Sequence, residues 1–304
     1  MSFTAKDVKD LREKTGCGMM DCKKALAASD GNMEAAIDFL REKGLAAATK
    51  KSSRVAAEGL AMAYTNDDAT VGVAIEVNSE TDFVAKNAEF QAFVKLCADL
   101  VMEKNPETVE DLLKITLDDG KTVESLLQEK ILTIGENIKI RRFKRFEGAV
   151  ASYVHAAGKI GVLVKFDVEN KDVISTEDFK NCAKDVAMQI AAVNPLYVNP
   201  DEIPAEVIDH ERKILKEQIV NDGKPDNIAE KIVEGRIGKY YKEVCLNNQI
   251  FVKDSNMSVS QYVESVAKKL SSKIKINSFV RFEKGEGIEK KSDDFASEVA
   301  GMIK

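Results

Sequence analysis

The residues best placed to act on another molecule lie between positions 78 and 87, in the sequence Asn-Ser-Glu-Thr-Asp-Phe-Val-Ala-Lys-Asn. This stretch follows an apolar, strand-like run and precedes an amphipathic helical pattern, so Asp82 and Phe83 stand at a helix start. Ser79, followed by an acid three residues later, predicts a capping box. Phe83 can begin the buried stripe that Phe90 continues. Alternatively, Asp82 and Phe83 are exposed at a tip and contact a partner.

An enzyme needs a constellation of reactive groups, and no motif in the sequence supplies one. Asp82 can act as an acid or base only beside a second group of complementary pKa. His155 follows a strand-like run, but no motif places a serine or cysteine nucleophile next to it, and His210 is expected to face solvent. The segment 285–287, Gly-Glu-Gly, is too short and acidic for a phosphate-binding loop. We therefore expect a binding function with no catalytic residue, cofactor or metal; a hydrolase using Asp82 and His155 is the alternative.

Composition and charge restrict the classes of function. Of the 304 residues, 44% are apolar and 32% are charged, which is typical of a folded soluble protein. A net charge of -6 disfavours direct nucleic-acid binding, because affinity for phosphates comes mostly from clustered Lys and Arg. No apolar run approaches the ~18 residues of a membrane span, and no secretory signal opens the sequence. We expect a cytoplasmic protein without a nucleic-acid or membrane partner.

The cysteines are odd in number, scattered and without a CxxC pair. This pattern predicts buried free thiols in a reducing compartment and argues against a disulfide framework or a zinc site. The five are Cys17, Cys22, Cys97, Cys182 and Cys245.

Residues 1–54 contain three short helical patterns separated by glycine. Thr4 predicts the cap of the first helix, and Gly16 predicts its end. Such a bundle is near the lower size limit for independent folding, so we interpret it as a docking domain. Its last part, residues 46–54, is either a linker or an exposed helix that leads out of the bundle.

The rest of the chain contains an internal repeat. Residues 55–146 form the first core subdomain, and residues 147–198 with 236–283 form the second; each shows a hairpin, a helix, further helices and a returning strand. Each copy can form a small antiparallel sheet with helices on one face, so the predicted fold class is α+β. The second copy has no Asp-Phe pair after its second strand. This difference puts a contact role for Phe83 on equal terms with a role in the shared fold.

Residues 199–235 interrupt the second copy with two helical patterns joined by a Gly-Lys-Pro turn. We expect a helical hairpin, which either projects and pairs with another molecule or folds back on its own domain. Residues 284–304 form a C-terminal module, with a last amphipathic helix predicted at 292–303.

Four motifs resemble the bacterial elongation factor Ts family, and together they extend over nearly the whole chain. They are Thr-Gly-Cys-Gly-Met-Met-Asp-Cys-Lys-Lys-Ala-Leu at 15–26, Thr-Asp-Phe-Val-Ala-Lys at 81–86, Ile-Gly-Glu-Asn-Ile at 134–138 and Gly-Glu-Gly-Ile-Glu-Lys at 285–290. Cys17 stands where the family commonly has a small residue.

The resemblance implies a fold and a function. The fold is a small three-helix, ubiquitin-associated-like N-terminal domain, a duplicated core of antiparallel sheet and helices, an inserted dimerisation-type helical hairpin and a C-terminal helix. The function is guanine nucleotide exchange on the GTPase elongation factor Tu in translation elongation, without covalent chemistry by the factor itself. A passive adaptor, which binds a partner without speeding nucleotide release, is the other alternative.

The resemblance also implies which residues contact the GTPase. The tip that is inserted near the nucleotide and dislodges the partner's Mg²⁺ comprises Thr81, Asp82, Phe83 and Val84. The residues that dock on the partner are Arg12, Met19, Met20, Lys23 and His155. Whether the hairpin pairs with itself in a homodimer or touches the partner stays open.

Overall fold

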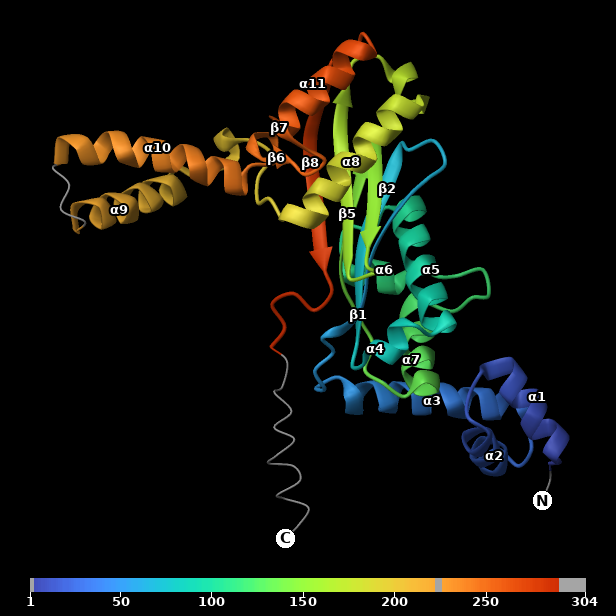
Figure 1. Cartoon of the computed structure of the whole chain (residues 1–304). Helices are drawn as coiled ribbons and strands as arrows, with labels where there is room; N and C mark the ends of the chain where they lie inside the picture. The colour runs from blue at the N-terminus through green and yellow to red at the C-terminus, as the bar shows by residue number, and fades with distance from the viewer. Residues whose placement is uncertain (1–2, 222–225, 290–304) are drawn as a thin grey trace. The chain divides into compact units, whose positions relative to one another are not determined.

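The computed structural model describes residues 3–221 and 226–289 and contains both helices and small sheets (Figure 1). This mixture confirms the predicted α+β class. The chain divides into two compact units. The first comprises the described parts of Met1–Ala61, Ile75–Phe143 and Glu283–Lys304, and the second comprises Met62–Ala74 and the described parts of Lys144–Phe282. The helix predicted at 292–303 and the turn predicted at 222–225 lie outside the described residues.

The first unit opens with three helices, α1 (Ala5–Thr15), α2 (Met19–Ala28) and α3 (Met33–Lys51). The Thr4 hydroxyl accepts a hydrogen bond from the Asp7 amide, and the Asp7 carboxylate accepts one from the Thr4 amide, so α1 starts with a capping box. Gly16 ends α1 in the left-handed conformation, as predicted. Because α3 continues to Lys51, most of the predicted linker is the exposed helix of the two alternatives.

A small apolar core joins these three helices. It includes Leu11, Cys22, Leu26 and Leu40, and Leu132 of α7 (Val123–Ile134) packs against the same cluster. A bundle of this size gains stability from such a neighbour, because it buries little surface alone.

The first sheet has the strand order β1-β2-β3, from β1 (Glu58–Thr65), β2 (Val71–Ser79) and β3 (Lys139–Glu147). The connection from β2 to β3 contains α4 (Asp82–Ala85), α5 (Ala88–Lys104), α6 (Val109–Lys114) and α7. Strand β2 is buried along nearly its whole length. It therefore leads directly from the core to the stretch at 78–87.

The second unit contains a sheet with the order β4-β5-β8, from β4 (Ala149–His155), β5 (Ile160–Val168) and β8 (Ile274–Glu283). Strands β4 and β5 pair antiparallel, from Ala149 opposite Phe166 to His155 opposite Ile160. The other elements are η1 (Lys171–Ser175), α8 (Glu177–Val193), η2 (Pro200–Glu202), η3 (Leu246–Asn248), β6 (Ile250–Phe251), β7 (Asp254–Ser258) and α11 (Val259–Lys269).

The two halves of the chain repeat one arrangement in detail. Helix α5 follows β2 and helix α8 follows β5, and each has 17 residues. The first ends at Asn105 and the second at Asn194, both left-handed and both followed by proline, which cannot continue a helix. The similarity of the two sequences therefore reflects a similarity of structure.

A helical hairpin is inserted in the second unit, formed by α9 (Ala205–Asn221) and α10 (Asp226–Val244), which run side by side in Figure 1. Ile219, Val233 and Ile237 form its small apolar core. Helix α10 continues beyond residue 235, where the sequence predicted the insertion to end. Among the helices of the described residues, none has the length and hydropathy that a membrane span requires.

All five cysteines are buried free thiols, which confirms the prediction. They contribute as small apolar side chains of the helix cores.

Gly59 of β1 tests how closely the first sheet is packed. Its φ is +113°, and a Cβ added there would lie 2.2 Å from the carbonyl oxygen of Val77. We expect Gly59→Ala to lower the free energy of unfolding by about 1–3 kcal/mol, because the side chain meets both backbone strain and rigid backbone. Gly235→Ala in α10, where the Cβ meets nothing within 4 Å, is the control and should stabilise by about 0.5–1 kcal/mol. Thermal unfolding of both variants checks the pair; equal stability would contradict it.

Candidate partner-binding site

The tip that follows β2 is a single helical turn, α4. Its side chains divide sharply: Val84 and Ala85 are buried, whereas Phe83 is 76% exposed. The buried stripe of the next helix begins instead at Phe90, which is fully buried. Phe83 is therefore part of an exposed tip and is not the first residue of the buried stripe.

The predicted capping box at Ser79 is wrong. Ser79 is still part of β2 and is buried, and its hydroxyl donates to the Thr81 carbonyl oxygen at 3.0 Å. Helix α4 has Thr81 at its N-cap without a side-chain cap, and it ends at Lys86. The long helix α5 has its own cap, the Asn87 side chain, which accepts from the Glu89 and Phe90 amides at 2.8 and 3.3 Å. The sequence predicted one helix where the chain forms two.

Asp82 and Lys86 flank the exposed ring. Their carboxylate and ammonium lie 3.2 Å apart, and both side chains are more than half exposed. The Lys86 ammonium also lies 5.7 Å from the centre of the Phe83 ring. Exposed pairs of this kind stabilise a fold little, so the Asp82 carboxylate is free to exchange its partner for a group on another molecule.

Two acidic residues anchor the base of the tip. Glu136 accepts hydrogen bonds from both the amide and the hydroxyl of Thr81, at 2.9 and 2.6 Å. Glu80 accepts one from the amide of Asn137 at 2.6 Å. The Asn137 side chain, which is buried, donates to the Arg54 carbonyl oxygen at 2.8 Å. In the sequence, residues 134–138 stand out only as a motif, and no local pattern indicates this role.

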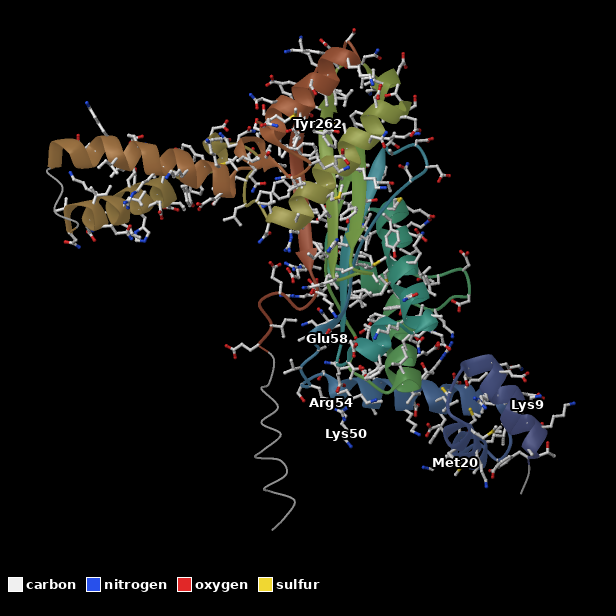
Figure 2. The ribbon with its side chains drawn as sticks, viewed as in Figure 1. Lys9, Met20, Lys50, Arg54, Glu58 and Tyr262 are labelled. Carbon is white, nitrogen blue, oxygen red and sulfur yellow. The ribbon has the colours of Figure 1, made fainter. Side chains whose placement is uncertain are left out.

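The expected docking residues of the first unit are all on its surface. Arg12 and Lys23 are exposed, and Met19 and Met20, the first residues of α2, are 45% and 61% exposed. Met20 is labelled in Figure 2, beside α2. Exposed methionines are adaptable apolar contacts and are frequent at binding surfaces.

The same unit brings the end of α1 close to the tip. A hollow of about 300 Å³ is lined by Gly16, Phe83, Val84, Asn87, Glu89, Thr133 and Ile134. The three-helix bundle and the tip therefore contribute to one surface. This proximity joins two segments that are about 65 residues apart in the sequence and that no local pattern connects.

The chain matches the protein-family model described as Elongation factor TS over residues 80–286. It belongs to the elongation factor Ts family. Curated relatives with the name Elongation factor Ts align over the whole length. That of Clostridium kluyveri (strain NBRC 12016) is 51% identical over 306 residues, covering 99% of each chain. That of Clostridioides difficile (strain 630) is 51% identical over 305 residues, covering 100% of this chain and 99% of the relative.

The elongation factor Ts of Trichlorobacter lovleyi (strain ATCC BAA-1151 / DSM 17278 / SZ) is also similar, with 49% identity over 305 residues. That alignment covers 99% of this chain and 98% of the relative. Membership of this family places the chain among the elongation factors of protein biosynthesis. The segment matched by the family model begins at Glu80, the first acid of the anchored tip.

The expected contact at His155 lies in the second unit, at the end of β4. Its side chain is exposed, and its Nδ1 lies 3.1 Å from the Tyr153 hydroxyl. His210 is exposed on α9, as predicted. Within the described residues, no group of three or more histidine, cysteine or acidic side chains is arranged to hold a metal ion.

A fully buried carboxylate, Glu76 of β2, is a second feature that the sequence did not reveal. It accepts from Nη1 of Arg141 at 3.0 Å, from Nε of Arg142 at 2.7 Å and from the Gly285 amide at 2.8 Å. Arg142 also pairs with Glu286 at 3.1 Å. Within the first unit of this elongation factor Ts relative, the acidic Gly-Glu-Gly segment is therefore bound to β2 and β3.

The burial of the thiols predicts how slowly they react. Burial raises the pKa of the Cys97 and Cys182 thiols to about 12 and that of Cys245 to about 11. At pH 8 a thiol of pKa 12 has roughly a thousandfold less thiolate than an ordinary one, so these thiols should react far more slowly with Ellman's reagent in the native protein than in urea. A native thiol that reacts at the denatured rate would contradict the burial described here.

Proposed function

We propose that this chain is a guanine nucleotide exchange factor for elongation factor Tu. It binds the GDP-bound GTPase, disturbs the binding of Mg²⁺ and phosphate through the Thr81–Val84 tip, and promotes GDP release so that GTP can bind. Family membership supports the partner. The observation that carries the mechanism is the exposure of Phe83 on an anchored turn.

Exchange without covalent chemistry follows from thermodynamic linkage. A factor that binds the nucleotide-free GTPase more tightly than the GDP-bound form must weaken GDP binding by the same ratio. Each ~1.4 kcal/mol of this coupling changes affinity tenfold. The protein therefore needs only a surface that fits the distorted partner.

Phe83 and Asp82 are suited to different parts of this task. Burial of a phenyl ring in the partner supplies about 1.5–3 kcal/mol toward the distorted state. A carboxylate is a preferred ligand of Mg²⁺ and repels phosphate, so Asp82 would compete with the partner's own groups for the ion and disturb the phosphate beside it. In the structure its carboxylate pairs with the exposed Lys86, which another charged group can easily displace.

The remaining contacts hold the tip against the partner. Arg12, Met19, Met20 and Lys23 form the docking surface of the first unit, and His155 adds a contact from the second. The protein acts in the cytoplasm. The hairpin formed by α9 and α10 stays a predicted dimerisation element.

Phe83→Ala tests the role of the tip. We expect the variant to bind elongation factor Tu but to release labelled GDP about ten- to a hundredfold more slowly at saturation, because the energy of ring burial is lost. Stopped-flow fluorescence of labelled GDP measures this. Leu196→Ala, which removes a 61% exposed apolar side chain of the second unit, is the control. Unchanged release by Phe83→Ala would rule out burial of this ring as a cause of GDP release.

The same assay separates the alternative functions. A passive adaptor binds the GTPase without any acceleration by the unmodified protein. A hydrolase turns over its own substrate without a GTPase present. Either result with the full chain would replace the proposed function.

Met20→Ala tests the docking surface. We expect it to raise the concentration of factor that gives half-maximal exchange several-fold, with little change in the maximal rate, because the side chain contributes the same energy to the initial and distorted complexes. Val252→Ala, which truncates a 48% exposed residue between β6 and β7, is the control. A lower maximal rate with an unchanged half-maximal concentration would place Met20 with the tip instead.

A further inference from the structure

The short helix of the tip, α4, needs support from its neighbours to keep a fixed orientation. Helix α4 comprises only four residues, and a helix of this length is not stable by itself. Its N-cap residue Thr81 does not cap it, since the Thr81 hydroxyl donates to Glu136. Its most exposed side chain, Phe83, contributes little burial. The direction of the tip must therefore be fixed from its two ends.

At the downstream end, apolar burial and a cap are sufficient. Val84 and Ala85 are buried, and the Gln91 side chain donates to the Ala85 carbonyl oxygen at 3.0 Å. The Lys86 and Asn87 amides donate back to Phe83 and Val84. This end fixes where the chain enters α5.

At the upstream end, the segments 80–81 and 136–137 are joined by hydrogen bonds in both directions. Each segment supplies one carboxylate that accepts from the other segment. Glu136 receives both Thr81 donors, and Glu80 receives the Asn137 amide. Hydrogen bonds to a charged acceptor are about twice as strong as neutral ones, and a two-point contact also fixes orientation. These hydrogen bonds hold the two segments together as one rigid joint.

The joint includes a third segment. The Asn137 side chain donates to the Arg54 carbonyl oxygen, and the Arg54 guanidinium lies 3.5 Å from Glu80. Arg54, labelled in Figure 2, lies between the end of α3 and the start of β1. The three-helix bundle and the tip thus meet at the same few hydrogen bonds.

We propose that Glu136 is a positioning residue for nucleotide exchange: by holding the amide and hydroxyl of Thr81 it presents Phe83 in a fixed direction relative to the docking surface. This inference rests on the proposed function. A tip that is ordered before binding does not lose backbone freedom in the complex, so more of the ring's burial energy is available for the distorted state. The role explains why threonine stands at 81, since its amide and hydroxyl both donate to one carboxylate.

A double-mutant cycle tests the proposal. We expect Glu136→Ala to slow maximal GDP release from elongation factor Tu about tenfold, which corresponds to the loss of order at one residue. In a Phe83→Ala background the same substitution should have less than about a twofold effect, because Glu136 acts only through the ring. Equal slowing in both backgrounds overturns the proposal, since a general loss of structure would act in this way.

Glu129→Ala is the matched control. Glu129 is an acid of α7 in the same unit, similarly half-buried and paired with Lys121 at 2.8 Å, but without a hydrogen bond to the tip in the structure. It should leave maximal exchange within about twofold. If Glu129→Ala slows exchange as much as Glu136→Ala, the positioning role is wrong.

A second measurement needs no GTPase. In the free protein, the Thr81 amide donates to Glu136, so hydrogen exchange at Thr81–Val84 should become at least about tenfold faster in Glu136→Ala while α5 keeps its protection. Glu136→Gln, which keeps one acceptor oxygen, should lie between the two, and it serves for both measurements if the alanine variant does not fold. Unchanged exchange at the tip in the glutamine and alanine variants overturns the proposal.

The two hypotheses fail in different ways. If GDP release with Phe83→Ala is as fast as with the unmodified protein, the proposed role of the tip is wrong, whatever Glu136 does to amide protection. If Phe83→Ala is slow and Glu136→Ala is fast, only the positioning role fails.

Discussion

An aromatic ring exposed to water cannot hold itself in place, and this constraint governs the first unit. Burial orders most side chains of the core, but Phe83 is 76% exposed and gains little from folding. Its position depends on neighbours: buried Val84 on one side and the Thr81–Glu136 hydrogen bonds on the other. Among the described residues, the most exposed large apolar side chain therefore stands next to hydrogen bonds that a carboxylate accepts.

Strand β2, which leads to the tip, carries a second polar anchor. Glu76 is fully buried, and a buried carboxylate destabilises a fold unless charged donors surround it. Arg141, Arg142 and the Gly285 amide supply those donors. Because Gly285 has φ +70° and a Cβ there would lie 2.0 Å from the Ala57 carbonyl oxygen, glycine is required for the close approach. Glu76 thus fixes both β2, which leads to the tip, and the segment that follows β8.

The sequence was sufficient for features that depend on local periodicity and failed for those that depend on tertiary hydrogen bonds. The three N-terminal helices, the two sheets and the buried thiols could be predicted because apolar spacing and glycine positions signal them locally. The capping box at Ser79 was wrong because β2 continues through that residue. Glu136 and Thr81 are 55 positions apart, and Glu76 and Gly285 are 209 apart. No periodic pattern connects such pairs, so only the fold reveals the anchors.

The second half of the chain shows what the tip adds to the shared scaffold. After β5 the chain forms the short helix η1, which buries Val173, and Thr176 then caps α8. At the corresponding place after β2, the short helix exposes Phe83 instead. Both connections join the second strand of a sheet to a 17-residue helix, so the scaffold requires a turn there but not an exposed ring. One copy buries an apolar side chain of this turn, Val173, and the other exposes Phe83. The exposure of Phe83 is therefore better explained by contact with a partner than by the needs of the fold.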